Sequence, residues 1–317
     1  MTSKWPVQGL AQFMAEDYPV EEDLIEPSLL IRGGKMQLYG KAKVGKSYLI
    51  LQLALCLSGG RDWLGYRVPR PARTLYVQCE IVPGQLQRRL RGLTSEFPTG
   101  VDMMHVSNVY DRVLAKRDDF DDLASVITAA GVEVVIIDPL YLFMLGSEIA
   151  GEDTATFIRG LNYVNAATNA AIIIVHHSRK MVAQADGAVR PGMDSSKGST
   201  NLVQWPDTIA SLAKVGEGKV ELRWEGVRHG KEPPPRMLRF DDLAGRFEVL
   251  TNEPHGFIIE ALQDGPVSVP DLDGAIEAAT GLSNSQVRRI RRQMREEGFV
   301  VEYKDKDDER KRWVARS

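Results

Sequence analysis

The apolar positions of the chain fall into short runs that alternate with stretches of helical length. Four runs are rich in β-branched residues and show no apolar–polar alternation: KMQLYG, RTLYVQCE, VEVVIIDP and AAIIIVHH. Such runs are typical of parallel strands that are covered on both faces. The stretches between them predict helices at 46–58, 84–93, 118–130 and 154–169. This alternation predicts an α/β fold with a doubly wound, mainly parallel sheet.

The same pattern indicates where the chain divides. Three later runs predict further strands: TIASLAKV, KVELRWEGV and RMLRFDD. Residues 180–200 have no periodicity and contain much Gly, Ser and Asp, which is typical of a functional or disordered loop. The pattern breaks again near residues 251–255. We predict an N-terminal arm at 1–35, a main domain at 36–250 and a small domain at 255–317.

The small C-terminal domain has a pattern of its own. Three helical stretches precede two strand-like runs that a charged turn joins: HGFIIEALQDG, SVPDLDGAIEAAT, GLSNSQVRRIRRQMREEGFV and FVVEYKDKDDERKRWVARS. In the third helical stretch, Val287, Ile290 and Met294 recur on one face, and Ser283 or Asn284 can cap its start. Arginines cover much of the remaining surface of this helix: Arg288, Arg289, Arg291, Arg292 and Arg295.

Charge and cysteine content narrow the class of protein. The formal net charge of −3 does not mark the whole chain as a nucleic-acid binder, so any basic surface is local. Cys56 and Cys79 match no metal or redox spacing, and we expect them to pack as small hydrophobic residues in a reducing cytosol. The N-terminal residues lack the order of a signal peptide. No apolar run approaches the roughly 18 residues of a membrane span, which predicts a cytoplasmic protein with no membrane partner.

One turn between a predicted strand and a predicted helix carries the pattern G-x-x-x-x-G-K-[ST] in full. It comprises Gly40, Lys41, Ala42, Lys43, Val44, Gly45, Lys46 and Ser47. In such a turn, backbone N–H groups surround phosphate oxygens, the lysine contacts the β and γ phosphates, and the hydroxyl binds Mg²⁺. The following helix adds its N-terminal dipole to the anion site. A chance match is the alternative, but the strand before and the helix after favour a site for ATP and Mg²⁺.

Hydrolysis of ATP needs further groups, and three other strand ends supply candidates. Asp138 ends a buried strand, where it is suited to hold Mg²⁺; the alternative is a cap of the turn before Pro139. Glu80 ends another strand and is assigned as the base that positions the attacking water; alternatively, it is a solvated loop residue. His176 and His177 end a fourth strand and point to opposite faces, so at most one of them faces the phosphate, and a structural role is the alternative.

Taken as an ordered set, these segments resemble RecA-like ATPases and, most closely, the branch of hexameric RepA-type plasmid replicative helicases. The matching segments lie between about residues 28 and 245: LLIRGGKMQLYGKAKVGKSYLILQLA, TLYVQCE, VVIIDP, IIIVHHSRK and KGSTNLVQWPD. The resemblance implies a homohexameric ring with ATP bound between subunits. It also implies that Glu80 is the catalytic glutamate and Asp138 the Mg²⁺-associated aspartate. His177 falls where DnaB-type relatives place a phosphate-sensing glutamine, which ranks it above His176.

The sequence departs from the family pattern at the arginine finger. Asp207 stands where the RepA-type pattern has that arginine. The DnaB-type pattern has a Lys-x-Arg pair on a later strand, of which this sequence has Gly226 at the lysine position and Arg228 at the arginine position. Arg228 is therefore the candidate finger that reaches into a neighbour's site, and an ordinary solvated arginine is the alternative.

Two segments are candidates for DNA contacts. The loop 180–200 falls where RecA-like relatives place DNA-contacting loops in the ring's channel, and its candidate residues are Lys180, Arg190 and Lys197. The C-terminal pattern resembles a winged helix-turn-helix domain, which implies a third helix in the major groove and a hairpin on the phosphates. The corresponding residues are Arg288, Arg289 and Arg292 on the helix and Lys311, Arg312 and Arg316 on the hairpin. A protein-docking domain is the alternative, because acidic residues at 305–309 dilute the positive charge.

The leading hypothesis is a DNA-dependent ATPase, a ring-forming replicative helicase of a plasmid, phage or other mobile element. The second hypothesis is an ATP-switched DNA-binding regulator of replication or transcription without helicase activity, which Asp207 and Gly226 favour slightly. A recombinase-like ATPase that forms filaments is the third. A small-molecule kinase is disfavoured, because the sequence shows no acceptor pocket or lid. Stimulation of hydrolysis by single-stranded DNA separates the first and third hypotheses from the second.

Overall fold

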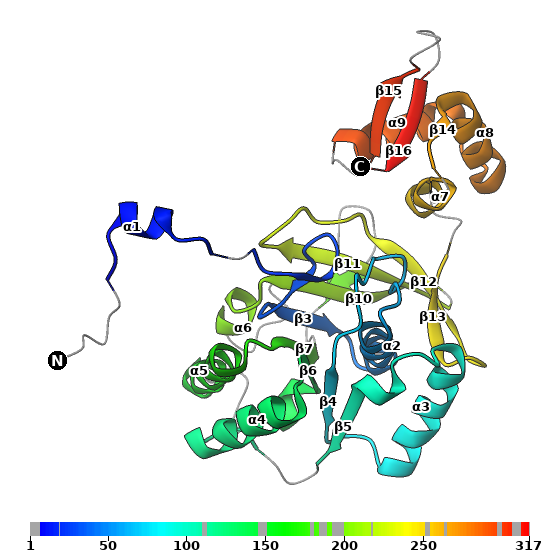
Figure 1. Cartoon of the computed structure of the whole chain (residues 1–317). Helices are drawn as coiled ribbons and strands as arrows, with labels where there is room; N and C mark the ends of the chain where they lie inside the picture. Colours follow the sequence, from blue (N-terminus) through cyan, green and yellow to red (C-terminus); the bar gives the residue numbers. More distant parts are fainter. Residues whose placement is uncertain are drawn as a thin grey trace.

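A computed structural model gives the fold of the chain (Figure 1). It describes residues 7–18, 20–109, 113–144, 151–177, 181–183, 189–191, 200–216, 218–250, 254–262, 265–296, 300–305 and 312–316. Within these ranges, every helix is too short or too polar to cross a membrane.

The body of the protein is a nine-stranded sheet in which six neighbouring strands run parallel. In spatial order these are β5 (Met104–Asn108), β4 (Thr74–Gln78), β6 (Val134–Asp138), β7 (Ala171–His177), β3 (Lys35–Gly40) and β10 (Thr208–Gly216). An antiparallel extension follows β10: β11 (Lys219–Val227), β12 (Arg236–Asp241) and β13 (Arg246–Val249). After β3 the chain continues to β4 on one side of the sheet, whereas the next strand of this sheet after β7 is β10, on the other side. A crevice is therefore expected at the carboxyl ends of β3 and β7.

Helices cover both faces of the parallel strands (Figure 1). One face carries α2 (Lys46–Gly59) and α3 (Pro83–Glu96); the other carries α4 (Arg117–Ala130), α5 (Gly151–Thr168) and α6 (Thr200–Gln204). Successive residues of β6 face opposite sides, because Val134 and Ile136 pack into the core with α2, whereas Val135 and Ile137 pack with α4 and α5. This two-sided burial explains the unbroken apolar run in the sequence and confirms the mixed α/β fold with a mainly parallel sheet.

The elements agree with the sequence pattern where periodicity was strong and differ where it was weak. The ends of the four predicted helices differ from the observed ends by at most three residues. Several short elements were not predicted: α1 (Leu10–Ala15), β1 (Asp23–Ile25), β2 (Leu30–Ile31), β5, β8 (Met181–Ala183), β9 (Val189–Pro191) and β13. The sequence of β5, MHVSN, shows no apolar run because this strand lies at the edge of the sheet and is only partly buried.

The predicted N-terminal arm has two parts with different environments. The helix α1 has no buried side chain, and its Leu10 and Met14 side chains are exposed. The strands β1 and β2, in contrast, contribute Leu24, Ile25 and Leu30 to the hydrophobic core of the main body. The limit of the arm at residue 35 stays a prediction.

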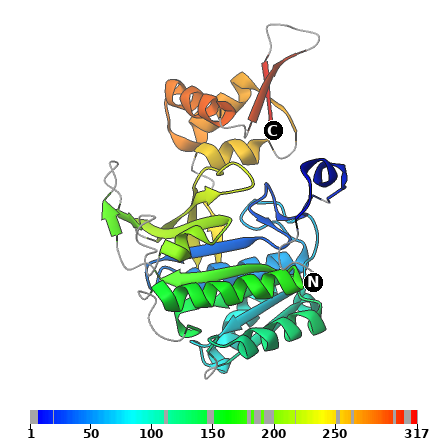
Figure 2. The same cartoon turned by 90° about the vertical axis from the view of Figure 1, so that its left-hand side faces the viewer.

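The C-terminal residues form a small unit with a core of its own (Figure 2). It contains α7 (Pro254–Ala261), β14 (Val267–Ser268), α8 (Val269–Thr280), α9 (Asn284–Glu296), β15 (Val300–Lys304) and β16 (Arg312–Arg316). The three strands pair in the order β14-β16-β15. On α9, Val287 and Met294 are fully buried and Ile290 is partly buried, which is the apolar face that the sequence indicated. The winged helix-turn-helix assignment stays a prediction.

Candidate nucleotide-binding site

The phosphate loop connects β3 to α2 at the carboxyl edge of the sheet. Its backbone is left-handed at Lys43 (φ 62°) and Gly45 (φ 102°). A Cβ atom at Gly45 would lie 2.6 Å from the Phe247 ring, and one at Gly40 would lie 2.4 Å from the Leu212 carbonyl oxygen. None of the described side chains caps the first turn of α2, so its N–H groups remain available to an anion. The two glycines therefore allow the backbone to enclose a phosphate.

Lys46 begins α2, and only 4% of its surface is exposed. Its ammonium group donates to the carbonyl oxygens of Gly40 (2.8 Å) and Lys41 (3.0 Å) and lies 3.2 Å from Nδ1 of His177. Burial lowers the pKa of Lys46 to about 8, although nearby carboxylates act in the opposite direction. The ammonium group therefore lies inside the loop, where a bound phosphate would favour its charged form.

This pKa predicts how ATP affinity depends on pH. Below about pH 8 Lys46 is already protonated without nucleotide, so affinity is expected to be constant there. Above that value, binding must restore the proton, and affinity is expected to fall by up to about tenfold per pH unit. Titrations of ATP binding between about pH 7 and pH 9.5 measure this effect. Lys46→Arg is the control, since its guanidinium stays charged and its profile should be flat; a flat wild-type profile would contradict the assignment.

Asp138 ends β6, and 3% of its surface is exposed. The Tyr76 hydroxyl donates to its Oδ2 atom at 2.7 Å, and the Ser47 hydroxyl also hydrogen-bonds to the carboxylate. Burial raises the pKa of Asp138, so its charged form would gain from a cation. Ser47 and Asp138, the residues predicted to bind Mg²⁺, are therefore in contact. Tyr76 orients the carboxylate, and the sequence pattern did not indicate this residue.

The donor set around Asp138 fits Mg²⁺ bound together with a nucleotide. Mg²⁺ usually takes one or two protein oxygens and fills its remaining positions with phosphate oxygens and water. One buried carboxylate beside one hydroxyl matches this arrangement. Within the described part of the chain, no group of three or more His, Cys, Asp or Glu side chains is placed to hold a metal ion by itself. The site is therefore suited to a metal that arrives with phosphates.

Glu80 and His177 lie at the carboxyl ends of the two strands that flank β6: Glu80 follows β4, and His177 ends β7. Glu80 follows β4 with an exposed side chain, and its N–H group donates to Oε1 of Gln78 at 3.0 Å. Its charge raises the pKa of Lys46, which places it near the loop. Burial and the ammonium of Lys46 lower the pKa of His177 to about 4, so its ring is neutral at pH 7. His176 is buried on the opposite face of β7. Their roles in hydrolysis stay predictions.

A hollow of about 520 Å³ lies beside the phosphate loop. Three aromatic side chains line it: the Phe240 ring centroid lies 4.9 Å from that of Tyr48 and 5.0 Å from that of Phe247. Lys43 and Lys219 also line this space. Aromatic walls next to a phosphate loop suit a nucleobase. The sequence pattern does not reveal this part of the site, and its only local signal is Tyr48, directly after the motif.

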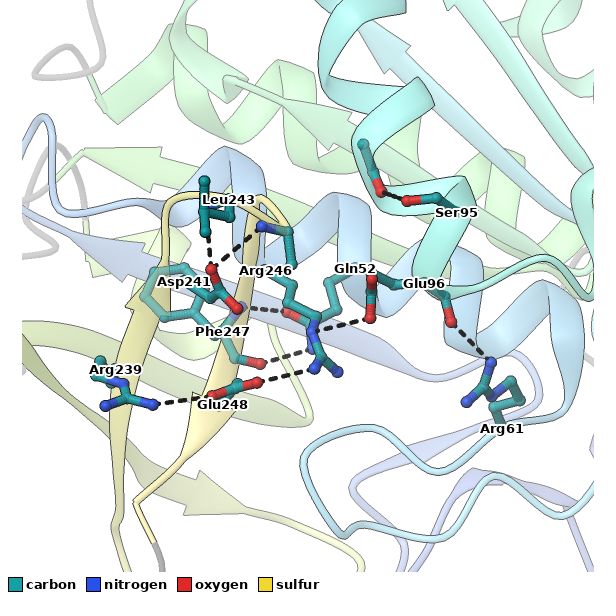
Figure 3. A network of polar contacts seen from close by, with 12 residues as sticks. Gln52, Arg61, Ser95, Glu96, Arg239, Asp241, Leu243, Arg246, Phe247 and Glu248 are labelled. Atoms are coloured by element: carbon teal, nitrogen blue, oxygen red, sulfur yellow. Dashed lines mark hydrogen bonds and ion pairs between the residues drawn. The ribbon is translucent and has the colours of Figure 1, made fainter.

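Polar contacts fix the aromatic wall against α2 (Figure 3). The Gln52 side chain donates to the Phe247 carbonyl oxygen (3.0 Å) and accepts from the Phe247 N–H group (2.8 Å). Arg246 pairs with Glu248 at 2.8 Å on β13. Asp241 accepts two backbone N–H groups of the turn that joins β12 to β13. The hairpin that carries both phenylalanines is therefore held in place beside the loop.

Comparisons with known proteins agree with this geometry. A family model described as an AAA domain matches residues 8–183, which is more than half of the chain and includes the phosphate loop. The chain belongs to this AAA family. A solved structure described as "The Structure Of A DnaB-Like Replicative Helicase And Its Interactions With Primase" is similar with a TM-score of 0.52 and 15% sequence identity. The match covers 68% of this chain and 57% of that chain, so it spans little more than half of the other protein's length.

These findings support the fold and the phosphate loop that the sequence predicted. This AAA-family chain has the phosphate loop and the RecA-like fold of a P-loop ATPase, as the motif and the resemblance of the ordered segments implied. Likeness at 15% identity shows the fold alone. The RepA-type branch, the ring and the roles of single residues stay predictions.

Arg228 lies far from the phosphate loop of its own chain. It follows β11, whose end pairs with the start of β10 at the amino edge of the parallel strands. Its guanidinium donates to Asp207 Oδ1 at 2.7 Å and to the Gln204 carbonyl oxygen at 3.3 Å. The structure therefore does not bring Arg228 to the nucleotide site of its own chain, and any finger role requires a second copy.

The predicted DNA-contacting residues divide into three groups. Lys180, Lys197 and Lys311 lie outside the described residues. The backbone of Arg190 pairs with Val182 in the β8–β9 hairpin, but the side chains of Arg190 and Arg316 are not among those described. On the C-terminal unit, four predicted residues have exposed side chains: Arg288, Arg289, Arg292 and Arg312.

The prediction that the arginines of α9 cover its solvent side is wrong for Arg291. It is 8% exposed, and its guanidinium donates to both carboxylate oxygens of Asp273 (2.8 and 3.1 Å) and to Glu302. Arg291 recurs at the helical spacing of Val287 and Met294, so it belongs to the buried face. It joins α9 to α8 and β15 rather than facing DNA.

Arg291→Ala is therefore expected to destabilise the C-terminal unit by about 3–5 kcal/mol. The loss has this size because Asp273 would stay buried without its bidentate partner, while Glu302 would keep its bond to Arg295 at 3.3 Å. Hydrogen-exchange protection of α8 and α9 in the full chain measures the effect. Arg289→Ala, on the exposed side of the same helix, is the matched control and should leave protection unchanged. Equal protection in the two variants would contradict a supporting role for Arg291.

Proposed function

We propose that this protein is a DNA-dependent ATPase of the ring-forming replicative helicase kind. The observation that carries the proposal is the arrangement of the phosphate loop and the neighbouring strand ends. Lys46 lies inside the loop, Ser47 hydrogen-bonds to the Asp138 carboxylate, and Glu80 follows the next strand of the sheet. These groups are what hydrolysis of a nucleoside triphosphate needs. The AAA family match and the likeness to a DnaB-like replicative helicase support it.

Each residue has a role that follows from its position. The first turn of α2 and the loop N–H groups bind the phosphate oxygens, and Lys46 turns from the Gly40 and Lys41 carbonyls towards the β and γ phosphates. Ser47 and Asp138 would hold Mg²⁺, which supplies positive charge to the phosphates when bound.

Glu80 is exposed at the mouth of the site, where it orients a water molecule and accepts its proton during attack on the γ phosphate. His177 is neutral at pH 7 and donates or accepts a hydrogen bond without adding charge. Its Nδ1 atom lies 3.2 Å from the Lys46 ammonium, so movement of the lysine towards phosphate changes the surroundings of the ring. His177 is therefore suited to report the γ phosphate to β7 and the loop that follows it.

DNA binding is proposed for the C-terminal unit. Arg289 and Arg292 are exposed on α9 and form no ion pair with any described residue, while Arg288 lies 3.8 Å from Asp273 with most of its side chain exposed. Exposed guanidinium groups along one helix suit phosphates and base edges.

An ATP-switched DNA-binding regulator is the second candidate function. It is favoured by the ion pair between Arg228 and Asp207, which occupies the candidate finger. A protein of this kind would bind ATP and a duplex site and would hydrolyse ATP slowly. Single-stranded DNA would not change its turnover.

The deciding experiment is steady-state ATP hydrolysis with and without single-stranded DNA. Strong stimulation is expected for the proposed function, followed by strand displacement on a forked duplex. Glu80→Gln controls for contaminating ATPases. Slow turnover that ignores single strands, together with tight binding of a duplex site, would replace the proposal with the regulator.

Removing the exposed arginines of α9 tests the DNA surface. The triple variant Arg288→Ala, Arg289→Ala and Arg292→Ala is expected to weaken DNA binding and to lower the salt dependence of affinity by about 0.9 for each phosphate that the variant no longer neutralises. Binding titrations at several salt concentrations measure both quantities. A matched control removes three exposed arginines of the main body: Arg88, Arg91 and Arg239. An equal loss in both variants would show a general effect of charge and would contradict the assignment to α9.

A further inference from the structure

A hollow of about 340 Å³ lies in the C-terminal unit, where α9 packs against β15 (Figure 1). Arginine side chains form most of its wall. The residues that line this arginine hollow are Arg288, Arg291, Arg292 and Arg295 from α9, Glu302 from β15 and Arg312 from β16. The fold therefore gathers guanidinium groups from a helix and a strand around one space.

Three of these arginines follow one line of α9. Arg288, Arg292 and Arg295 recur at the spacing that places side chains on the same face of a helix. Like charges at this spacing repel each other and destabilise a helix. The line therefore has an electrostatic cost that a bound anion would remove.

Two carboxylates fix the floor of the hollow. Asp273 accepts from the buried Arg291 at 2.8 and 3.1 Å. Glu302 also accepts from Arg291, and it accepts from Arg295 at 3.3 Å. These contacts hold the floor in place before any ligand arrives, which reduces the entropy that binding would cost.

The remaining arginines carry positive charge in excess of these carboxylates. Arg292 and Arg312 are exposed, and neither forms an ion pair within the part of the chain that the structure describes. Arg288 lies 3.8 Å from Asp273, with 66% of its side chain exposed. Guanidinium groups bind phosphate oxygens through pairs of parallel hydrogen bonds. Several of them around one space are therefore suited to a phosphate group with several free oxygens.

The shape and charge of the hollow favour a terminal phosphate over a phosphate within a DNA strand. A phosphate within a strand carries a single negative charge, and an element that reads duplex DNA projects into a groove. A terminal phosphate carries about two negative charges at pH 7 and three free oxygens. A recess lined by guanidinium groups can surround such a group on several sides, which a projecting helix surface cannot do.

We propose that the arginine hollow binds a terminal phosphate group, carried by the end of a DNA strand or by a free nucleotide. Arg288, Arg292 and Arg312 contact the phosphate oxygens, and Arg295 adds positive charge beside them. The inference goes beyond the proposed function, because this site needs neither hydrolysis of ATP nor a ring. The hollow shares Arg288 and Arg292 with the proposed DNA surface of α9, so a free anion in it competes with DNA.

Titration of the full chain with inorganic pyrophosphate tests the site. The Lys46→Ala variant serves as the background, because its phosphate loop lacks the ammonium group that would hold the same probe. Calorimetry measures the affinity, and hydrogen-exchange protection shows where the probe binds. Binding is expected, with increased protection of α9 and β15.

Variants of the lining residues test which groups hold the probe. The double variant Arg295→Gln, Arg312→Gln in the same background is expected to weaken pyrophosphate binding by about tenfold or more, because it removes two charged donors. Arg312→Gln alone should also weaken binding, and this exposed position makes no described ion pair that folding would need. Arg91→Gln, at an exposed arginine of the main body, is the matched control and should bind the probe as before.

Two further titrations distinguish the sources of the phosphate. A preference for a duplex with 5′-phosphate ends over the same duplex with 5′-hydroxyl ends, lost in the double variant, would assign the hollow to DNA ends. Displacement of DNA by ATP from the Lys46→Ala protein, also lost in the double variant, would assign it to a free nucleotide.

The outcomes separate failure of this site from failure of the proposed function. If pyrophosphate does not bind to the Lys46→Ala protein, or protects only the phosphate loop and α2, the arginine hollow is not a site. Equal affinity in the double variant, or an equal loss in Arg91→Gln, would overturn the inference in the same way. A wild type that does not hydrolyse ATP would contradict the proposed function and leave the pyrophosphate result unchanged.

Discussion

Glu80→Gln is expected to lower the rate of ATP hydrolysis by about 10³-fold while leaving ATP affinity nearly unchanged. The amide keeps the size of the side chain but cannot accept the proton of the attacking water. The side chain is exposed at the end of β4, so the substitution removes no buried contact. Phosphate release under saturating ATP, together with a binding titration of the same preparation, measures the two quantities separately.

Glu232→Gln is the matched control for this prediction, since Glu232 is an exposed glutamate far along the chain from the site. It should hydrolyse ATP at the wild-type rate. If Glu80→Gln also hydrolysed ATP normally, another group would have to position the water. If it lost ATP binding instead, Glu80 would act through the shape of the turn after β4 rather than in the chemical step.

Asp138→Asn is expected to reduce Mg²⁺-dependent hydrolysis by about 100-fold or more. The carboxylate is buried beside the Tyr76 and Ser47 hydroxyls, and its charge would be the local partner for a metal that accompanies ATP. The amide keeps an oxygen that can accept from Tyr76 but carries no charge. Hydrolysis rates across a range of Mg²⁺ concentrations measure the effect, and a higher Mg²⁺ requirement is expected for the variant.

The free energy of unfolding supplies a second test of the Asp138 role. Burial raises the pKa of this carboxyl group, so its charge is held at a cost without nucleotide. Asp138→Asn should therefore leave the nucleotide-free protein as stable as the wild type, or more stable. Denaturation without and with Mg²⁺-ATP checks this, and ATP should stabilise the wild type more than the variant. A variant that unfolds readily without nucleotide would indicate a structural role for Asp138.

Sequence reasoning located the phosphate loop and the strands around it because their signals are local. The Gly40 to Ser47 motif lies within eight consecutive residues, and Asp138 ends a run whose burial on both faces makes it visible as an unbroken apolar segment. Parallel strands place their carboxyl ends at one edge, so the strand-end residues could be grouped from the order of the runs alone.

The parts that the sequence did not reveal depend on contacts between distant segments. Phe240 and Phe247 look like ordinary strand residues until the β12–β13 hairpin lies beside α2. Arg291 has the composition of an exposed helix residue, and only the placement of Asp273 and Glu302 makes it a buried one.

Gln52 and Phe247 bond to each other across 195 residues of chain, so this contact can form only after both segments have been synthesised. During synthesis the N-terminal segment leaves the ribosome first, so the nascent chain carries the phosphate loop well before its aromatic wall. Contacts of such large sequence separation also slow folding, because the entropy of closing the long loop is lost before the contact stabilises the fold. Tight nucleotide binding is therefore expected only of the finished main body, and ATP is expected to stabilise completed chains over truncated ones.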